Sequence, residues 1–438
     1  MKIHFIGIGG IGVSALAKYY LVKGNKISGS DLTETELTID LKKKGAIINI
    51  SHHKKSNVPS DADLVIFSPA VEKTNPELKE AKRRRIEVKS YPEALGDLTK
   101  KHFTIAVSGT HGKSTTTALI ALILVKANFD PTVIVGTKLK EFGNSNCRVG
   151  DSKYLVIEAD EYFGSFLNYY PKVIVLTNID KDHLDYYKNL NNILEAYKEY
   201  VFHLKEDGTL ILNKDDNNSL KILDSTIKFK VRNYSFEQKE REELEKILKI
   251  PGDHNIYNAL AALTAARALR IKDNVSFEAL SEYKGAWRRF DERKITLRNK
   301  EITVIHDYGH HPKEIEATLK AGRKKYGEER IICVFQPHQY QRTYYLFSDF
   351  VKVFQGAIDK NLIDNLIITD IYSVEGREKE SIKRKVSSKR LIKAIDRKGV
   401  SFLKKEKIVD SLKRKVKEND IVILMGAGDI YDLSFFLK

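Results

Sequence analysis

Near its start the sequence reads Lys2-Ile-His-Phe-Ile-Gly7-Ile-Gly9-Gly10-Ile-Gly12, a short apolar run with four closely spaced glycines, followed by an apolar helical stretch. This order predicts a β-strand over residues 2–6, a tight phosphate-binding turn and a helix. In such a turn Gly7 permits the bend, Gly9 lets the backbone approach a phosphate, and Gly12 lets the helix pack on the sheet. Asp31, nineteen residues past Gly12, stands where an acid that binds a ribose is expected. The stretch therefore predicts a Rossmann-like α/β domain that binds a nucleotide or dinucleotide.

The rest of the chain repeats the same alternation of β-branched runs and helical stretches, which is typical of parallel α/β units. Polar residues follow most of these runs, at the sheet edge where open α/β sheets place their ligands. A length of 438 residues predicts several domains. We expect three, at residues 1–95, 96–288 and 289–438, with linkers near residues 87–102 and 283–296. Further strands are expected at residues 64–67, 104–107, 154–157, 173–176, 302–305, 331–335, 366–369 and 421–424.

Composition excludes several classes of protein. A hydrophobic content of 42% with mixed charge argues against wholesale disorder. The two cysteines, Cys147 and Cys333, make a disulfide scaffold or a cysteine-based zinc site unlikely in this sequence. The longest apolar run, residues 118–125, is too short for a transmembrane helix, and the early glycines interrupt what resembles a signal peptide. These features predict a cytoplasmic protein without a membrane partner.

The net charge of +16 invites a nucleic-acid-binding function. Such a protein is expected to carry a clustered basic domain or a basic stripe interleaved with aromatic residues. Neither pattern is visible, and most Lys and Arg lie in helical stretches mixed with Glu. We therefore expect no nucleic-acid partner and attribute the surplus charge to solubility.

A second glycine loop carries clearer chemistry. It reads Gly109-Thr110-His111-Gly112-Lys113-Ser114-Thr115-Thr116, between an expected strand and an apolar helix. Backbone amides of such a loop cradle phosphates, the lysine neutralises the terminal ones, and the serine hydroxyl can bind Mg²⁺. The full motif would have glycine where Val107 stands, but the Gly-Lys-Ser core retains the mechanism. The loop predicts an ATP-binding, P-loop-type central domain.

Two clusters of acids follow expected strands downstream of this loop. The first is Glu158-Ala-Asp160-Glu161, and the second is Asn178-Ile-Asp180-Lys-Asp182-His183. Carboxylates in this position commonly hold Mg²⁺, and a neutral imidazole can do so too. We expect Glu158 and His183 to take part in metal binding, whereas capping of helix N-termini explains some of the other acids.

Three more polar segments are candidate contacts. His254, Asn255 and Asn258 share a helical face and could meet one ligand such as adenine. In the third domain, the segments 306–312 and 336–343 should lie at the ligand edge of the sheet. The adjacent His310 and His311 resemble half a zinc site, but no third ligand is suitably spaced, so zinc is not expected.

With these residues assembled, the sequence resembles the Mur ligases of peptidoglycan synthesis. The matching blocks span nearly the whole chain: GIGGIG, SGSD, GTHGKSTTT, EADE with GSFL, TNIDKDHLD, PGDHNIYNALAA, RRF, DYGHHP, FQPH and GAGDI. GTHGKSTTT and DHLD are shared across a wider superfamily that includes folate polyglutamylating enzymes. GIGGIG, GSFL, DYGHHP and FQPH are narrower and indicate the alanine-adding branch.

The resemblance implies three α/β domains and an ATP-dependent ligase that joins L-alanine to the carboxylate of UDP-N-acetylmuramate through an acyl phosphate. It implies ATP and Mg²⁺ as cofactors and a monomer or homodimer. The catalytic residues implied are Lys113, Glu158 and His183. The implied ligand contacts are Ser114, Glu158 and His183 for metal; Gly109, Thr110, His111, Gly112, Lys113, Ser114, Thr115, Asn258, Arg289 and Asp307 for ATP; Gly7, Gly9, Gly10, Gly12 and Asp31 for the UDP-sugar; and Tyr308, His338 and Arg342 for the amino acid.

The chain also departs from the family pattern. Gln339 stands where the family usually has arginine, which puts strict L-alanine specificity in question. Tyr162-Phe163 follows EADE where the family tends to have an acid, and the segment between Asn233 and Pro251 is shorter than usual. The alternatives are a ligase that recycles murein tripeptide and, from another class, an NAD-dependent oxidoreductase based on Gly7–Gly12 and Asp31. An ATP-driven nucleic-acid-binding protein is a third reading.

Overall fold

The structure, a computed structural model, describes residues 1–374 and 378–437. The described chain contains three β-sheets and divides into two compact units. The first unit comprises residues 1–180, 191–247 and 257–283, and it holds two of the sheets. The second unit comprises residues 181–190, 248–256 and 284–438, and it holds the third. The predicted class, three α/β domains built on largely parallel sheets, is confirmed.

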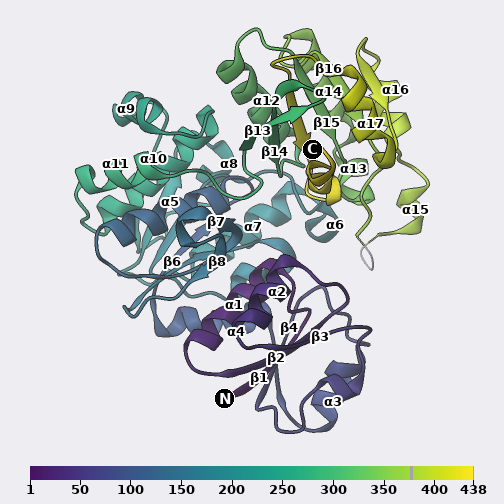
Figure 1. Cartoon of the computed structure of the whole chain (residues 1–438). Helices are drawn as coiled ribbons and strands as arrows, with labels where there is room; N and C mark the ends of the chain where they lie inside the picture. The colour runs from purple at the N-terminus through teal and green to yellow at the C-terminus, as the bar shows by residue number, and fades with distance from the viewer. Residues whose placement is uncertain (375–377, 438) are drawn as a thin grey trace. The chain divides into compact units, whose positions relative to one another are not determined.

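The first sheet is all parallel, with the strand order β3-β2-β1-β4-β5. Its helices α1, α2 and α4 lie on one face and α3 on the other (Figure 1). This order places the turn after β1 at the reversal point of the sheet, where doubly wound folds bind ligands. The elements are β1 (Lys2–Ile6), α1 (Ile11–Val22), β2 (Lys26–Asp31), α2 (Glu36–Lys43), β3 (Ile47–Ile50), η1 (Lys55–Asn57), β4 (Leu64–Phe67), α3 (Pro76–Arg83), β5 (Glu87–Ser90) and α4 (Tyr91–Lys101).

The second sheet has the order β12-β11-β10-β6-β9-β7-β8 and is parallel except for the β7–β8 hairpin. Its buried central strands β6, β9 and β10 carry the phosphate loop and the first acid cluster at their carboxyl ends. The strands are β6 (Phe103–Ser108), β7 (Thr132–Leu139), β8 (Ser145–Arg148), β9 (Tyr154–Glu158), β10 (Val173–Leu176), β11 (Thr209–Asn213) and β12 (Lys230–Tyr234). The helices are α5 (Lys113–Lys126), η2 (Lys140–Phe142), η3 (Tyr162–Asn168), α7 (Leu190–Val201), α8 (Asn217–Leu220), α9 (Glu240–Ile247), α10 (Asp253–Ala268) and α11 (Asp273–Glu282).

The third sheet has the order β13-β14-β18-β15-β16-β17, with β13 antiparallel to β14 and the rest parallel. Apolar clusters cover both of its faces, as a buried parallel sheet requires. The strands are β13 (Asp291–Leu297), β14 (Lys300–Asp307), β15 (Ile331–Phe335), β16 (Asn365–Ile368), β17 (Val400–Phe402) and β18 (Ile421–Met425). The helices of this unit are α6 (Leu184–Tyr187), α12 (Pro312–Tyr326), α13 (Tyr340–Tyr345), α14 (Phe347–Asp359), α15 (Glu380–Lys383), α16 (Ser388–Ile395), α17 (Lys405–Lys415) and η4 (Asp429–Phe436).

The segment 87–102, expected to be a linker, is instead a strand and a helix. Ser90 and Glu93 form a capping box, and Pro92 stands in the first turn, so α4 begins at Tyr91. The expected domain boundary between residues 95 and 96 therefore falls inside a helix. Gly96 faces the middle-domain backbone: a side chain there would place its Cβ 2.4 Å from the carbonyl oxygen of Asn168. Pro92 and Gly96, which suggested a linker, instead start helix α4 and let it approach the middle-domain backbone closely.

A buried carboxylate organises the first domain. Glu77 is fully buried and accepts hydrogen bonds from His4 Nε2 (2.9 Å), Ser30 Oγ (2.7 Å), His53 Nδ1 (2.8 Å) and Asn57 Nδ2 (2.9 Å). Burial alone would raise the pKa of Glu77, but these four donors lower it to about 2. The network joins β1, β2, the segment after β3, and α3 beneath the first glycine loop. Sequence patterns gave no indication of it.

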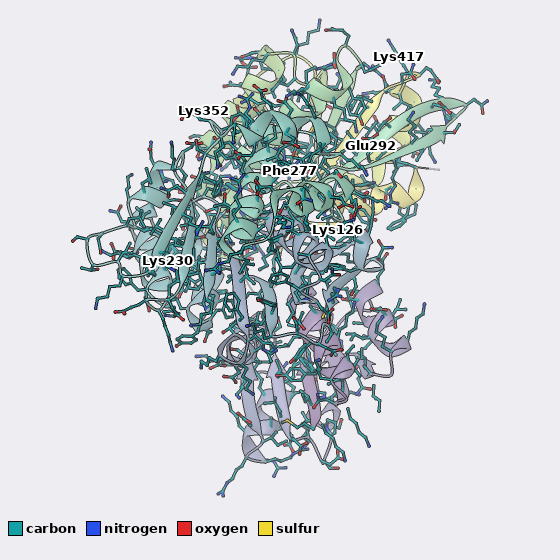
Figure 2. All side chains as sticks on the ribbon, turned by 90° about the vertical axis from the view of Figure 1, so that its left-hand side faces the viewer. Lys126, Lys230, Phe277, Glu292, Lys352 and Lys417 are labelled. Carbon is teal, nitrogen blue, oxygen red and sulfur yellow. The ribbon has the colours of Figure 1, made fainter. Side chains whose placement is uncertain are left out.

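Many of the surplus positive charges lie on the surface. Lys230, Lys352 and Lys417 are exposed (Figure 2), and Lys126 pairs with Glu278 and Glu282. Within residues 1–374 and 378–437, no helix is long and apolar enough to cross a membrane.

Replacing Glu77 by Gln is expected to destabilise the protein by about 2 kcal/mol at neutral pH, because buried donors lose a charged acceptor. The folded-state pKa lies below the ordinary value of 4.5, so ionised Glu77 stabilises the fold above about pH 4.5. That contribution is lost as pH falls toward 2. The difference in melting temperature between wild type and E77Q should therefore narrow over this range. A difference independent of pH would contradict the assigned ionisation.

Candidate functional site

The predicted phosphate loop forms between β6 and α5, and contacts with neighbouring residues fix its backbone conformation. Gly109 and Gly112 have φ values of 132° and 84°, which only glycine adopts readily. A Cβ at Gly112 would also lie 2.3 Å from Asn258 Oδ1. The loop backbone is tied to the end of β10: His111 N donates to Asn178 Oδ1 (3.0 Å), and Thr177 Oγ1 donates to His111 O (2.6 Å). These constraints leave the N-terminus of α5 preformed as an anion site.

Lys113 lies at the centre of this loop. Its Nζ donates to Gly109 O (2.7 Å) and Thr110 O (3.3 Å) and pairs with Glu161 Oε2 at 2.8 Å. Burial alone would lower the pKa of Lys113, but the carboxylates of Glu161 and Asp160 raise it above its usual range. The lysine therefore stays charged in a site from which water is largely excluded. Glu161, an acid of the first cluster, is the carboxylate that pairs with this cation.

Ser114 and Glu158 form an oxygen pair that fits Mg²⁺. Ser114 Oγ lies 3.1 Å from Glu158 Oε1, and Gly136 N donates to Glu158 Oε2 at 2.8 Å. Adjacent oxygens around an octahedral Mg²⁺ lie about 2.9 Å apart, given metal–oxygen distances near 2.1 Å. The hydroxyl and carboxylate thus have both the chemistry and the spacing to hold the ion together. His183, the third expected ligand, belongs to the second unit, so its metal role stays a prediction.

Three more of the residues predicted to bind ATP lie in or against this loop, and their contacts with ATP stay predictions. Thr115 is buried in the first turn of α5, and His111 Nε2 lies 3.6 Å from Asp180 Oδ2. Asn258, expected at the adenine, accepts a hydrogen bond from Thr116 Oγ1 (3.2 Å) and lies against Gly112. In this structure Asn258 shapes the phosphate loop, because its side chain occupies the space that Gly112 leaves.

The first glycine loop also forms as predicted, but two residues have other partners than expected. Asp31, predicted to bind a ribose, accepts from the amides of Gly9 and Leu32, each at 2.8 Å. Gly12 leaves space for Tyr91 and not for the sheet: a Cβ at Gly12 would lie 2.7 Å from Tyr91 Cζ. Gly7 has a φ of 75°, and Gly10 caps α1. The start of α1 remains suited to a pyrophosphate, whereas Asp31 fixes the loop.

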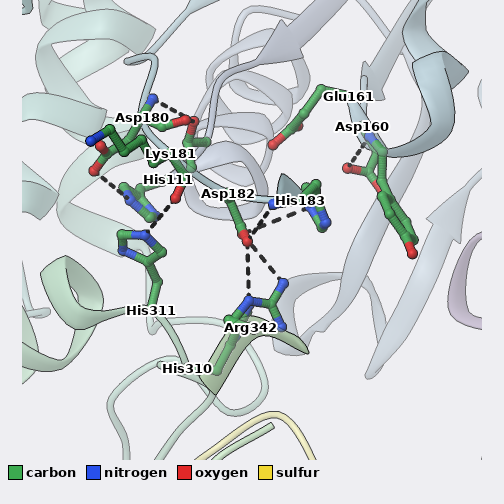
Figure 3. A network of polar contacts seen from close by, with 12 residues as sticks. His111, Asp160, Glu161, Asp180, Lys181, Asp182, His183, His310, His311 and Arg342 are labelled. Atoms are coloured by element: carbon green, nitrogen blue, oxygen red, sulfur yellow. Dashed lines mark hydrogen bonds and ion pairs between the residues drawn. The ribbon is translucent and has the colours of Figure 1, made fainter. Parts of the chain in front are cut away.

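In the second unit, Arg342 and Asp182 form a buried ion pair. Arg342 Nε lies 3.0 Å from Asp182 Oδ1, and the guanidinium also contacts His338 Nδ1 at 3.2 Å. Figure 3 shows Asp182 between Arg342 and the backbone of His183, whose N–H donates to it at 2.7 Å. Burial would raise the pKa of Asp182, but Arg342 holds it well below its usual range. The pair ties the segment 181–183 to α13.

The residues predicted to bind the amino acid are partly brought together. His338 contacts Arg342 and stacks on Tyr372, with the rings 5.5 Å apart. Tyr308 reaches this cluster through His310, whose ring lies 5.3 Å from that of Tyr308 and 5.8 Å from that of His338. Burial lowers the pKa of His310 to about 4 and that of His338 well below its usual value. Both imidazoles are therefore neutral at pH 7.

A hollow beside this cluster contains Gln339, the residue that departs from the family pattern. Its lining includes Asp182, His183, Gln339, Arg342 and Tyr345. Gln339 has a φ of 70°, a conformation unfavourable for a non-glycine residue, and its N–H donates to Tyr372 O at 2.9 Å. The side chain at this position therefore lies on the wall that also carries Arg342.

Asp307 and Arg289, expected at the nucleotide, have structural partners here. Asp307 accepts from Phe290 N (2.9 Å) and Gly309 N (2.8 Å), and burial raises its pKa. The Arg289 guanidinium lies 5.0 Å from the Tyr308 ring and 3.9 Å from Glu314. Their nucleotide contacts stay predictions. Arg288, which lies in the RRF block but was assigned no role from the sequence, is buried and donates to the carbonyls of Gly426 and Gly428.

Comparison with known proteins covers almost the whole chain. Residues 2–103 match the Mur ligase family catalytic domain, residues 107–266 the Mur ligase middle domain, and residues 288–428 the Mur ligase glutamate ligase domain. The chain belongs to the Mur ligase family. The resemblance seen in its motifs is thereby confirmed.

Individual relatives are more specific. The chain is 40% identical over 459 residues to a UDP-N-acetylmuramate–L-alanine ligase of Caldanaerobacter subterraneus, covering 99% of this chain and 96% of the relative. It is 41% identical over 463 residues to the enzyme of the same name from Clostridium tetani, covering 100% and 98%. Among solved structures, UDP-N-acetylmuramate-alanine ligase from Thermotoga maritima matches with a TM-score of 0.81 and 29% identity, covering 100% and 98%. A murein peptide ligase from Psychrobacter arcticus shares the fold, with a TM-score of 0.73 and 22% identity.

Replacing Glu158 by Gln should raise the Mg²⁺ concentration needed for half-maximal turnover by at least about tenfold, because a charged oxygen ligand is lost. Nucleotide-dependent turnover measured across a Mg²⁺ titration checks this. The control is Glu206→Gln, an exposed acid that pairs with Lys228 on the surface and should leave the curve unchanged. An identical Mg²⁺ dependence in E158Q and wild type would show that Glu158 is not a ligand.

Proposed function

We propose that this chain is an ATP-dependent ligase that joins L-alanine to the carboxylate of UDP-N-acetylmuramate in peptidoglycan precursor synthesis. The observation that carries the proposal is about 40% identity, over nearly the full length, to enzymes with that name. The site chemistry supports it independently. A charged, partly buried lysine in a phosphate loop and an adjacent oxygen pair suited to Mg²⁺ are what phosphoryl transfer from ATP requires.

The first step joins two anions. A carboxylate oxygen of the sugar acid attacks the γ-phosphorus, the bond to the bridging oxygen breaks, and ADP leaves with the electron pair. Lys113 and the amides at the start of α5 offset the charge that builds up on the phosphate oxygens. When bound at Ser114 and Glu158, Mg²⁺ would supply further positive charge against the same repulsion. The product is an acyl phosphate.

The second step forms the amide. The amino nitrogen of L-alanine attacks the activated carbonyl carbon, the bond to the phosphate oxygen breaks, and phosphate leaves while the nitrogen loses its proton. His338 and Arg342 are the residues we assign to the amino acid. Because Asp182 already engages Arg342, the guanidinium is fixed in orientation, with one nitrogen directed at the neutral His338. His183 keeps the metal role that the family pattern gives it.

The first glycine loop takes the UDP pyrophosphate in this proposal. The NAD-dependent alternative is less well supported, because it leaves the phosphate loop at Gly109–Lys113 without a role. The tripeptide-recycling ligase remains a same-class alternative with weaker similarity. We place the reaction in the cytoplasm, with a monomer or homodimer and no nucleic-acid or membrane partner.

Steady-state ADP release should require UDP-N-acetylmuramate and an amino acid together, because only the amine consumes the acyl phosphate, and Lys113→Ala should abolish it. The matched control is Lys126→Ala, at the other end of the same helix, where the lysine pairs with surface glutamates. We expect L-alanine to give the highest kcat/KM in a panel with L-serine, glycine and murein tripeptide. Preference for serine or glycine would contradict L-alanine as substrate and assign Gln339 a specificity role. Activity surviving in K113A would contradict the assigned phosphate loop.

A further inference from the structure

Tyr91 lies at the junction between the two anion-binding loops of the first unit. On one side its ring packs against Gly12: a Cβ there would lie 2.7 Å from Tyr91 Cζ and 2.8 Å from its Oη. On the other side, helix α4, which begins at Tyr91, packs on η3, and η3 directly follows the acid cluster that contains Glu158. Gly12 belongs to the loop suited to a pyrophosphate, and Glu158 to the site suited to Mg²⁺. Tyr91 therefore lies against the first glycine loop, on a helix that packs beside the acid cluster of the Mg²⁺ site.

The junction is built from packed elements on both sides. Helix α1 packs on β7 and β8 of the middle domain. Lys18, a nearly buried lysine of α1, donates to Asn146 Oδ1 at 2.9 Å, and Asn146 Nδ2 donates back to Ile11 O at 2.6 Å. Strand β7 in turn holds Glu158 through the amide of Gly136. The separation between the first glycine loop and Glu158 is therefore set by backbone packing.

Helix α4 fixes Tyr91 within this frame. The capping box of Ser90 and Glu93 starts the helix at Tyr91, and the close approach of Gly96 to Asn168 anchors its second turn to the middle domain. A tyrosine ring has only two rotatable side-chain bonds, and here one face is occupied by Gly12. Its hydroxyl is thus held in one place at low entropic cost.

The hydroxyl has the properties of a hydrogen-bond donor awaiting an acceptor. Burial raises the pKa of Tyr91, and the neighbouring charges of Glu158 and Asp160 raise it further, so the phenol stays protonated. Within residues 1–374 and 378–437, this hydroxyl makes no hydrogen bond. A neutral O–H donor beside the first glycine loop suits a ligand that is rich in oxygen acceptors.

We propose that Tyr91 is a substrate-binding residue whose phenolic O–H donates a hydrogen bond to the UDP-sugar acid, at the segment between its pyrophosphate and its reacting carboxylate. The inference rests on the proposed function in one respect, that the substrate spans both loops. Tyr91 then holds the sugar segment so that the carboxylate reaches the phosphate bound above Lys113. The contact would act on binding of the sugar nucleotide and leave ATP binding unaffected.

The test is Tyr91→Phe, which keeps the ring against Gly12 and removes only the hydroxyl. A neutral hydrogen bond contributes about 1 kcal/mol, so we expect the Kd and KM for UDP-N-acetylmuramate to rise about three- to tenfold. The KM for ATP, kcat and the melting temperature should stay near wild type. UMP, which ends before the sugar segment, should bind wild type and Y91F equally in calorimetry.

Tyr20→Phe is the matched control, because Tyr20 lies on α1 and packs on Phe5 and Tyr19 through its ring. It should bind both ligands like wild type. Unchanged affinity of Y91F for UDP-N-acetylmuramate, or an equal loss for UMP, would overturn the assignment of Tyr91. A wild type that binds UDP-N-acetylmuramate without releasing ADP would contradict the proposed function alone. A wild type that does not bind it would overturn both.

Discussion

The charge of the partly buried Lys113, paired with Glu161, is the interaction on which the rest of the site depends. Taking an ammonium group out of water is costly unless an opposite charge compensates it. Glu161 provides that charge at 2.8 Å, and the carbonyls of Gly109 and Thr110 accept the remaining hydrogens. The lysine is thus already charged before ATP binds, in the loop that we assign to the phosphates. Phosphate oxygens can replace the carbonyl contacts without requiring a proton to move.

This arrangement explains the detailed packing around the loop. Gly109 and Gly112 must be glycines, because Thr177 and Asn258 occupy the space that a side chain would need. Glu158 can hold both Ser114 and the amide of Gly136 only because Gly136 presents bare backbone: a Cβ there would lie 2.8 Å from Glu158 Oε2. The second unit uses the same principle at Asp182 and Arg342, where a buried ion pair fixes the orientation of a cation. In both units, charges are positioned by pairing before any ligand is bound.

The sequence predicted the features that depend on local pattern. Strands 2–6, 64–67, 173–176 and 331–335 have the expected bounds, and both glycine loops form between a strand and a helix. Apolar runs and glycine spacing suffice for this because they determine local backbone conformation and burial. The family was also identifiable, since its motifs are spread over the whole chain.

What the sequence did not reveal depends on partners distant in the chain. The Asp31 carboxylate accepts a hydrogen bond from the Gly9 amide, 22 residues away, which the spacing did not predict, and its contact with a ribose stays a prediction. Gly12 makes room for Tyr91, and Arg342 is held by Asp182 across 160 residues. Residues 87–102 looked like a linker because Pro92 and Gly96 punctuate them, yet tertiary contacts make them a strand and a helix. Spacing along the chain carries little information about such contacts.

The central claim is that the sugar-acid carboxylate attacks the phosphate held by the Lys113 loop, giving an acyl phosphate. The most direct test uses UDP-N-acetylmuramate labelled with ¹⁸O in that carboxylate, with ATP and L-alanine. One labelled oxygen should appear in the inorganic phosphate released for each amide formed, because the bond between carbonyl carbon and phosphate oxygen breaks in the second step. Phosphate that carries no label would contradict the mechanism.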